Sequence, residues 1–319
     1  MAVYTDISDE ALEGFLAAYD IGAVLALKGI AEGVENSNFF LLTEGGRFIL
    51  TLYEKRVAEA DLPFFLGLLD HLAARGVTCP QPVKARDGTI VRRLADRPAA
   101  IQTFLDGVSP KRPGVAHCGE AGEASARLHE ACRGFPLRRA NALSLGGWPA
   151  LAASTAAGAD GVQVGLKKVI ADELAFLEQA WPRDLPAGVI HADMFPDNTL
   201  FVGEKLTGVI DFYFACNDQL AYDVAVNLNC WCFEPDGSFN ITKGRAFLSR
   251  YQAVRTLSTA ERAALPVLAR GAALRFLLTR LHDWINRDPA ALVRPKDPLQ
   301  CLAWLRFHQH VQDAADYGL

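Results

Sequence analysis

Four polar residues between positions 191 and 211 have the types and the spacing that phosphoryl transfer needs. Asp193 follows His191 by two residues, Asn198 comes five residues later, and Asp211 comes thirteen residues after Asn198, at the end of an apolar run. One carboxylate can receive the proton of an attacking hydroxyl, while an amide and a second carboxylate can hold a divalent ion against phosphate oxygens. We therefore treat these four residues as candidate active-site groups.

Each of the four residues has an expected role. Asp193 is the expected base, because a carboxyl with an ordinary pKa of about 3.9 is already ionised at neutral pH. His191 is expected to hold the loop rather than to titrate. Asn198 and Asp211 are the expected Mg²⁺ ligands, since Mg²⁺ takes few oxygens from a protein and the rest from phosphates and water. The alternative is that all four only make local turn bonds, and their joint occurrence disfavours it.

The same stretch follows the protein-kinase pattern, in which His-x-Asp with a downstream Asn precedes an Asp-Phe-x segment. Two features differ from a protein kinase. Tyr213 stands where the Gly of Asp-Phe-Gly would be, and no Ala-Pro-Glu element follows. The pattern therefore predicts an ATP-dependent kinase and disfavours a protein substrate.

The elements that must position these residues differ between the two parts of the chain. In the first part, helical spacing over 9–19 and 59–75 alternates with β-prone apolar runs over 38–43, 47–53 and 99–105. In the second part, helical patterns cover most of the sequence, at 115–132, 166–181, 220–232, 242–251, 259–286 and 298–315. Short apolar runs between turn residues over 189–214 are the exception. The sequence predicts an α+β, bilobal protein-kinase-like fold, with a small β-rich N-lobe over 1–105 and a larger, mainly helical C-lobe over 106–319.

A nucleotide site is expected in the first lobe and at its exit. The turn before the strand at 38–43 is the candidate phosphate cradle, through Gly33, Val34, Asn36, Ser37 and Asn38. It has no Gly-x-Gly-x-x-Gly, so an ordinary hairpin loop remains an alternative. The other candidate nucleotide contacts are Thr51, which stands where a kinase normally has a strand Lys, Gln102 and Phe104 beside adenine, and Leu200 beneath its ring.

Composition and charge restrict the partners and the location. The net charge is −5 among 32 basic and 37 acidic residues, without the basic stripe of a nucleic-acid binder. No window approaches the roughly 20 apolar residues that span a bilayer, and the acidic first nine residues do not form a signal peptide. The seven cysteines are odd in number and scattered, which is typical of reduced thiols. A cytoplasmic protein without nucleic-acid or membrane partners is expected.

Several segments resemble the aminoglycoside-phosphotransferase and choline-kinase group of small-molecule kinases. They are 191–198, 210–212 and 221–225, and less specifically 33–39, 49–56, 126–129 and 275–284. Within that group the chain is similar to the bacterial homoserine kinases that share this fold, over nearly its whole length. The resemblance implies a reaction of ATP with L-homoserine that gives ADP and O-phospho-L-homoserine, on the way to threonine.

A homoserine site would need a cation for the α-carboxylate and a carboxylate or carbonyls for the ammonium. Arg275, Arg280, Asp283 and Trp284 lie on one long predicted helix and are the candidate substrate contacts. Ordinary ion pairs on a helix surface are the open alternative. Other acceptors, such as choline, a sugar or an aminoglycoside, and a nucleotide-binding pseudokinase also stay open. The sequence does not distinguish a monomer from a homodimer.

Overall fold

The computed structural model describes residues 5–30, 36–54, 57–287 and 295–319. The chain divides into two compact units. The first comprises Met1–Gly107 and Thr207–Tyr213, and the second comprises Val108–Leu206 and Phe214–Leu319. Asp211 therefore belongs to the first unit, whereas the segment from His191 to Asn198 belongs to the second.

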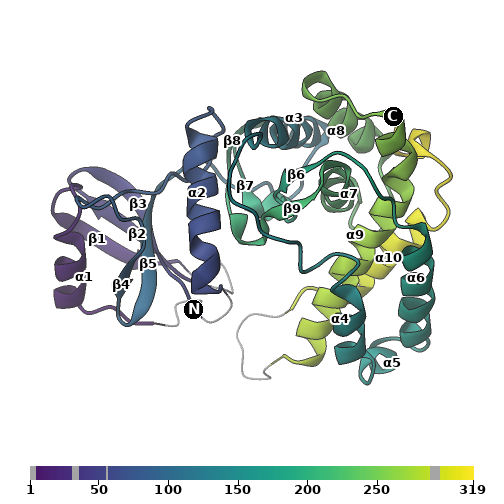
Figure 1. The fold of residues 1–319 in the computed structure, drawn as a ribbon, viewed down its shortest axis with the longest axis horizontal. Coiled ribbons are helices and arrows are strands. Elements are labelled where there is room, and N and C mark those ends of the chain that lie inside the picture. Colours follow the sequence, from purple (N-terminus) through teal and green to yellow (C-terminus); the bar gives the residue numbers. More distant parts are fainter. Residues whose placement is uncertain (1–4, 31–35, 55–56, 288–294) are drawn as a thin grey trace. The chain divides into compact units, whose positions relative to one another are not determined.

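The first unit is built on a five-stranded antiparallel sheet in the order β1-β2-β3-β5-β4 (Figure 1). Its strands are β1 (Val24–Gly29), β2 (Ser37–Thr43), β3 (Gly46–Leu52), β4 (Arg92–Leu94) and β5 (Arg97–Thr103). Two helices, α1 (Asp9–Leu16) and α2 (Leu62–Ala73), and a short 3-10 turn, η1 (Glu59–Asp61), accompany the sheet. Ser8 caps α1, because its Oγ accepts a hydrogen bond from the Ala11 backbone N–H at 3.2 Å.

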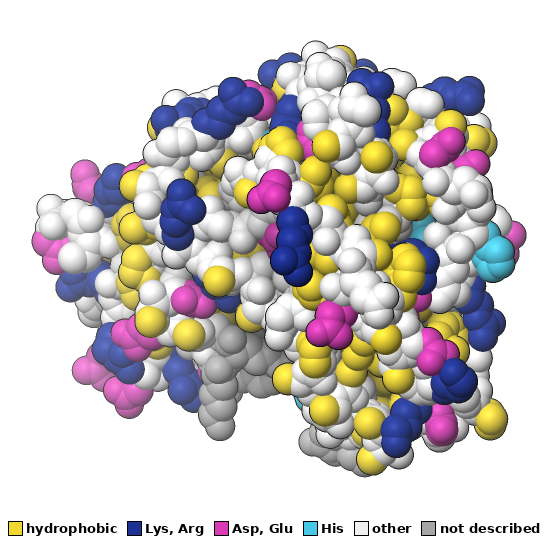
Figure 2. Space-filling view, turned by 45° about the vertical axis from the view of Figure 1, so that its right-hand side comes forward, with side chains coloured by type: hydrophobic (Ala, Val, Ile, Leu, Met, Phe, Trp, Pro, Cys, Tyr) yellow, Lys and Arg dark blue, Asp and Glu magenta, His cyan; other side chains and the backbone are white. Residues whose placement is uncertain are grey.

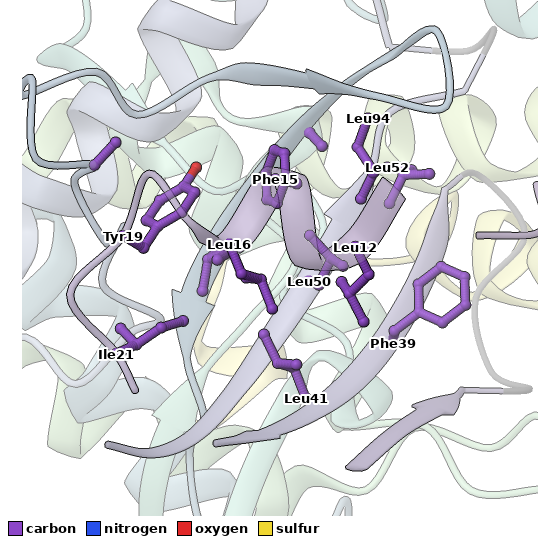
Figure 3. Close-up of a cluster of buried hydrophobic side chains, with 13 residues drawn as sticks. Leu12, Phe15, Leu16, Tyr19, Ile21, Phe39, Leu41, Leu50, Leu52 and Leu94 are labelled. Carbon is purple, nitrogen blue, oxygen red and sulfur yellow. The ribbon is translucent and has the colours of Figure 1, made fainter. Parts of the chain in front are cut away.

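Helix α1 covers one face of this sheet. Its side chains Leu12, Phe15 and Leu16 pack on alternate residues of the central strands, among them Leu41 and Leu50 (Figure 3). Successive strand side chains point to opposite faces, so the residues between these positions lie on the other face of the sheet.

That other face carries the candidate nucleotide residues. Asn38 pairs with Thr51 across β2 and β3, and Phe40 pairs with Lys28 across β2 and β1. Directly opposed residues of an antiparallel pair project to the same side. Lys28, Asn38 and Thr51 therefore share the face opposite α1.

The second unit is mainly helical. Its helices are α3 (Val115–Ala131), α4 (Trp148–Thr155), α5 (Ala159–Val162), α6 (Leu166–Ala180), α7 (Leu220–Trp231), α8 (Ile241–Val254), α9 (Thr259–Ile285) and α10 (Pro298–His308). The short strands β6 (Ala187–Ile190) and β9 (Cys216–Gln219) pair antiparallel, and β7 (Thr199–Val202) pairs with β8 (Lys205–Val209).

Helix α9 organises this unit. It begins with a capping box between Ser258 and Glu261, and it packs against α4, α7 and α10 (Figure 1). Residues from Leu274 to Leu278 are all buried, so this helix has no solvent-facing stripe along its middle.

Most of the expected elements are confirmed, with differences at weakly patterned segments. The predicted helix over 298–315 ends at His308, and a separate 3-10 turn, η4 (Ala314–Tyr317), follows under an Asp313 cap. The pattern did not predict β1, β4 or α4. These elements have three to eight residues, too few for a period of 2 or 3.6 to show above chance.

The surface has mixed charge. On the face drawn in Figure 2, Lys and Arg side chains are interspersed with Asp and Glu. Among the described residues, no helix is long and apolar enough to cross a bilayer.

Candidate active site

The loop after β6 holds the predicted base in an unusual backbone conformation. His191 is fully buried, and Ala192 has a φ of +63°. A non-glycine residue in this left-handed region is strained by roughly 1–3 kcal/mol unless its surroundings fix it. Contacts on both sides of the Ala192 peptide provide that support.

Asp223 of α7 is the first support. Its Oδ1 accepts from the Ala192 N–H at 2.8 Å, and its Oδ2 accepts from the His191 N–H at 3.1 Å and contacts His129 Nε2 at 2.9 Å. Burial by itself would raise the pKa of Asp223, but the hydrogen bond and charge of His129, with the backbone donors, hold it below its ordinary value. A buried carboxylate in its charged form thus fixes the backbone before Asp193.

A chain of buried polar contacts continues from His129. His129 Nδ1 lies 2.8 Å from the Tyr251 hydroxyl, which accepts from Arg255 Nη1 at 3.0 Å. Arg255 forms an ion pair with Glu261 at 2.6 Å, and Glu261 belongs to the capping box of α9. Four helices, α3, α7, α8 and α9, are therefore linked to the catalytic loop through side chains.

Three of the predicted residues meet within the loop itself. The Asp193 backbone N–H donates to His191 Nδ1 at 3.2 Å. Asn198 Nδ2 donates to the Asp193 carbonyl at 2.8 Å and to its Oδ2 at 3.1 Å. These contacts orient the Asp193 carboxylate and leave Asn198 Oδ1 for another partner. The loop-holding role expected for His191 stays a prediction.

Arg275 of α9 is the second support of the loop. Its guanidinium is 2% exposed, its Nη1 donates to the Ala192 carbonyl, and its Nη2 lies 3.7 Å from Asp193 Oδ1. The same group stacks over Phe276 at 4.3 Å. Arg275 Nε has no hydrogen-bond acceptor among the described residues. The sequence predicted a substrate contact here, whereas the structure places this cation on the loop and on the base.

The other predicted substrate residues lie further along α9. Arg280 is 8% exposed and donates to Gln300 Oε1 at 2.8 Å, with its guanidinium 5.2 Å from the Trp304 ring centre. Asp283 is exposed, with His282 at 3.7 Å, and Trp284 lies beneath the Arg287 guanidinium. The structure therefore does not gather the four residues at one point.

Asp211 lies two residues after β8, a strand that crosses from the second unit into the first at Thr207. It is exposed, has a φ of +62° and precedes the short turn η3 (Phe212–Phe214). Tyr213 anchors this turn, since its hydroxyl lies 3.4 Å from the Tyr53 hydroxyl and its ring packs edge-on against Phe65. Burial raises the pKa of Tyr213 to about 12, with a smaller contribution from the Asp211 charge. The aromatic residue in the place of Gly therefore fixes the carboxylate's segment by packing.

The structure describes only some residues of the candidate phosphate cradle. Gly33 and Val34 lie outside the described residues. Asn36 Oδ1 accepts from the Glu54 N–H at 3.3 Å, the Ser37 hydroxyl donates to Glu54 Oε1 at 2.8 Å, and Asn38 Oδ1 accepts from Thr51 Oγ1 at 2.8 Å. These side chains shape the end of β2, and a contact of each with phosphate stays a prediction.

The adenine contacts expected from the sequence lie in different units. Gln102, on β5, is 6% exposed, and the Phe104 ring packs edge-on against Phe40 in the first unit. Leu200 is half-buried on β7 in the second unit. Their adenine-binding roles stay predictions.

The oxygen atoms of Asn198 and Asp211 are of the kind that bind a divalent cation together with phosphate groups. Among the described residues, no group of three or more His, Cys, Asp or Glu side chains could hold a metal ion alone. Mg²⁺ is commonly bound by one or two protein oxygens together with phosphates and water. The Asn198 Oδ1 and the exposed carboxylate of Asp211 are oxygens of that kind.

Comparison with known proteins decides the family. The model of the phosphotransferase enzyme family matches residues 26–257, which include the whole loop and Asp211. The chain belongs to this family. It is therefore an enzyme that transfers a phosphoryl group to a hydroxyl.

Relatives of this phosphotransferase match it over its full length. The homoserine kinase of Xanthobacter autotrophicus is 63% identical over 319 residues, covering 100% of this chain and 99% of that protein. The homoserine kinase of Bradyrhizobium diazoefficiens is 62% identical over 320 residues, covering 100% and 98%.

Solved structures confirm the kinase-like fold at low identity. An amicoumacin kinase, in complex with AMP-PNP, Ca²⁺ and Ami, has a TM-score of 0.68 at 14% identity, covering 95% of this chain and 92% of that one. The choline kinase of Cryptosporidium parvum has a TM-score of 0.66 at 15% identity, covering 95% and 94%. The α+β fold class predicted from the sequence is thereby confirmed.

Proposed function

We propose that this phosphotransferase uses ATP to phosphorylate the hydroxyl of L-homoserine, giving ADP and O-phospho-L-homoserine in the cytoplasm. The choice of acceptor is supported by the relatives of 60–63% identity, which are homoserine kinases along their whole length. The observation that carries the chemistry is the loop in which His191, Asn198 and Arg275 fix one carboxylate, Asp193.

The proposed mechanism needs only one proton acceptor from the protein. The substrate hydroxyl oxygen attacks the γ-phosphorus, the bond from that phosphorus to the bridging oxygen of ADP breaks, and the hydroxyl proton passes to Asp193. Because its neighbours orient the carboxylate, it can align the hydroxyl before the proton moves. Asn198 and Asp211 would hold Mg²⁺, which supplies neutralisation of phosphate charge.

Arg275 acts on the base in this proposal and not on the substrate. Its guanidinium bonds the Ala192 carbonyl and lies beside Asp193 Oδ1, so it holds the loop and favours the charged carboxylate. We therefore replace the substrate role expected from the sequence with a positioning role.

Lys28 of β1 is our candidate for the cation that contacts the nucleotide phosphates, because Thr51 stands where a kinase normally has a strand Lys. Lys28 is exposed on the sheet face of Asn38 and Thr51, and it has no ion-pair partner among the described residues. Other basic residues of this unit, such as Arg93 and Arg97, are paired with Glu59 and Glu54. An exposed ammonium on this face of the sheet can contact a nucleotide phosphate.

A coupled ADP-release assay tests the proposal. The wild-type protein is offered L-homoserine, L-serine, L-threonine, choline and a sugar panel, and L-homoserine should give the highest kcat/KM. Asp193→Asn should lower kcat by at least about a hundredfold, the effect of a lost general base. A higher kcat/KM for choline or a sugar would overturn the acceptor, and near-normal turnover of Asp193→Asn would remove this residue from the mechanism.

A further inference from the structure

An exposed ion pair joins the loop of the proposed base to the segment before α10. Asp197 belongs to the 3-10 turn η2 (Pro196–Asn198) and precedes Asn198. Its Oδ2 lies 2.7 Å from Lys296 Nζ, and both side chains are 57% exposed. An exposed pair of this kind stabilises a fold by about 0–1 kcal/mol, so stability alone gives little reason for it.

Two cationic side chains lie near the ring of Phe195, which stands between Asp193 and Asp197 in the sequence. Lys296 Nζ lies 5.1 Å from the centre of the Phe195 ring, and the Arg280 guanidinium lies 5.8 Å from it. The Phe195 ring itself packs edge-on against Phe276 of α9. The segment before α10, the C-terminal half of α9 and the loop of Asp193 therefore meet at one aromatic ring.

The thiol of Cys230 is affected by several charged side chains of this region. Cys230 of α7 is partly exposed, and burial raises its pKa well above the ordinary value. The carboxylates of Asp193 and Asp197 raise this pKa further, while Arg280 and Arg275 lower it. The charges of Asp193 and Asp197, which belong to the same loop, therefore act on the same thiol in opposition to the two arginines.

The chemistry of the proposed acceptor needs such an arrangement. In L-homoserine the hydroxyl oxygen is separated from the α-ammonium by three carbons, a reach of roughly 5 Å for bonds of about 1.5 Å. A site must therefore offer an anion and a cation a short distance from the base. Arg275 is occupied by Ala192 and Asp193, and Arg280 Nη1 is occupied by Gln300. Of the three cations Arg275, Arg280 and Lys296, only Lys296 is exposed.

We propose that Asp197 and Lys296 form the subsite for the α-amino-acid group of the acceptor. Asp197 binds the α-ammonium and Lys296 binds the α-carboxylate, so the substrate zwitterion inserts between two side chains that otherwise pair with each other. This inference rests on the proposed function and adds the basis of its selectivity. An alcohol that lacks one charge leaves the matching protein charge unpaired, and polar groups left unpaired give strong discrimination.

Two analogues of L-homoserine separate the two charges. 3-Amino-1-propanol lacks the carboxylate, and 4-hydroxybutyrate lacks the ammonium. Each is measured as a substrate or, where it is not turned over, as a competitive inhibitor against L-homoserine. The variants are Lys296→Met and Asp197→Asn, and Lys168→Met is the matched control, because Lys168 forms an exposed 2.7 Å pair with Asp172 on α6.

The expected result is selective by substrate. Lys296→Met should lower kcat/KM for L-homoserine roughly 10- to 100-fold, the value of one charged hydrogen bond, and change the constant for 3-amino-1-propanol less than threefold. Asp197→Asn should do the same for L-homoserine and spare 4-hydroxybutyrate. The KM for ATP should stay within twofold of wild type in both variants, and Lys168→Met should match wild type throughout.

Three results would overturn the subsite. Equal losses for all three compounds would indicate a general effect on the loop. A wild-type enzyme that binds L-homoserine no better than the two analogues would show that neither charge is recognised. Substrate-selective losses in Arg280→Met with none in Lys296→Met would assign the carboxylate to Arg280. Failure of the proposed function is distinct, because the wild-type enzyme would then phosphorylate another alcohol in preference to L-homoserine.

Discussion

Replacing Asp223 with Asn tests whether a buried carboxylate builds the catalytic loop. The side chain is 1% exposed and receives three contacts, from the N–H groups of His191 and Ala192 and from His129 Nε2. An amide has one acceptor oxygen. If that oxygen keeps the Ala192 N–H, the new NH₂ group faces the His191 N–H, and two donors oppose each other.

The magnitude follows from these contacts. One buried backbone N–H without a partner costs about 1–3 kcal/mol, and loss of the charge weakens the bond that remains. We expect the free energy of unfolding to fall by about 2–4 kcal/mol. A shift of the Asp193 carboxylate by about 1 Å would lower turnover by about a hundredfold. Because Asp223 touches neither substrate in the proposed site, the KM for ATP should change less than threefold.

The assay combines chemical denaturation with steady-state kinetics. Asp172→Asn is the control, since Asp172 is an exposed partner of Lys168, and it should leave both quantities unchanged. Near-ultraviolet circular dichroism confirms that the Asp223→Asn protein is folded before kinetics are compared. If the folded variant keeps kcat within twofold of wild type, the carboxylate does not position the loop and the reasoning is wrong.

Four further perturbations probe the two units separately. Asp211→Ala should weaken binding of the Mg²⁺–nucleotide complex at least tenfold by calorimetry, and unchanged affinity would refute its ligand role. Lys28→Met should raise the KM for ATP roughly tenfold by removing a charged contact, while Arg93→Met, which loses only an exposed pair with Glu59, should not. Arg275→Lys should lower kcat with little change in the KM for L-homoserine, whereas the reverse pattern would restore the substrate role. Burial, with a smaller effect of Arg270, lowers the pKa of His308 to about 3. The unfolded chain therefore binds more protons between about pH 6.5 and pH 3, stability falls as pH falls through that window by up to about 1.4 kcal/mol per unit, and His308→Gln should flatten this slope in acid denaturation.

The sequence predicted three candidate site residues that the structure brings together within one loop, and their catalytic roles stay predictions. His191, Asp193 and Asn198 are close in sequence, so their spacing alone brings them together once the loop turns at Ala192. The apolar, β-prone run over 38–43 likewise predicted a strand, which the structure shows as β2. Local periodicity carries such information because neighbouring residues can only be a few ångströms apart.

The supports of that loop could not be predicted in the same way. Arg275 lies on a helix far along the chain, and only tertiary packing shows that its guanidinium meets the Ala192 carbonyl rather than solvent. Asp223 and His129 were missed as site residues. A signal existed for Asp223, since a carboxylate inside the apolar run of α7 is costly to bury without partners. The identity of those partners depends on where α3 and the loop lie.

A continuous series of polar contacts connects the start of α9 with the candidate active site. It runs from Ser258 through Glu261, Arg255, Tyr251 and His129 to Asp223. Helix ends fray sooner than helix centres open. If warming opens the first turn of α9, Asp193 should therefore be held less rigidly while most of the molecule is still folded. We therefore expect the heat tolerance of turnover to depend on this helix cap, which makes it a target for stabilising substitutions far from the chemistry.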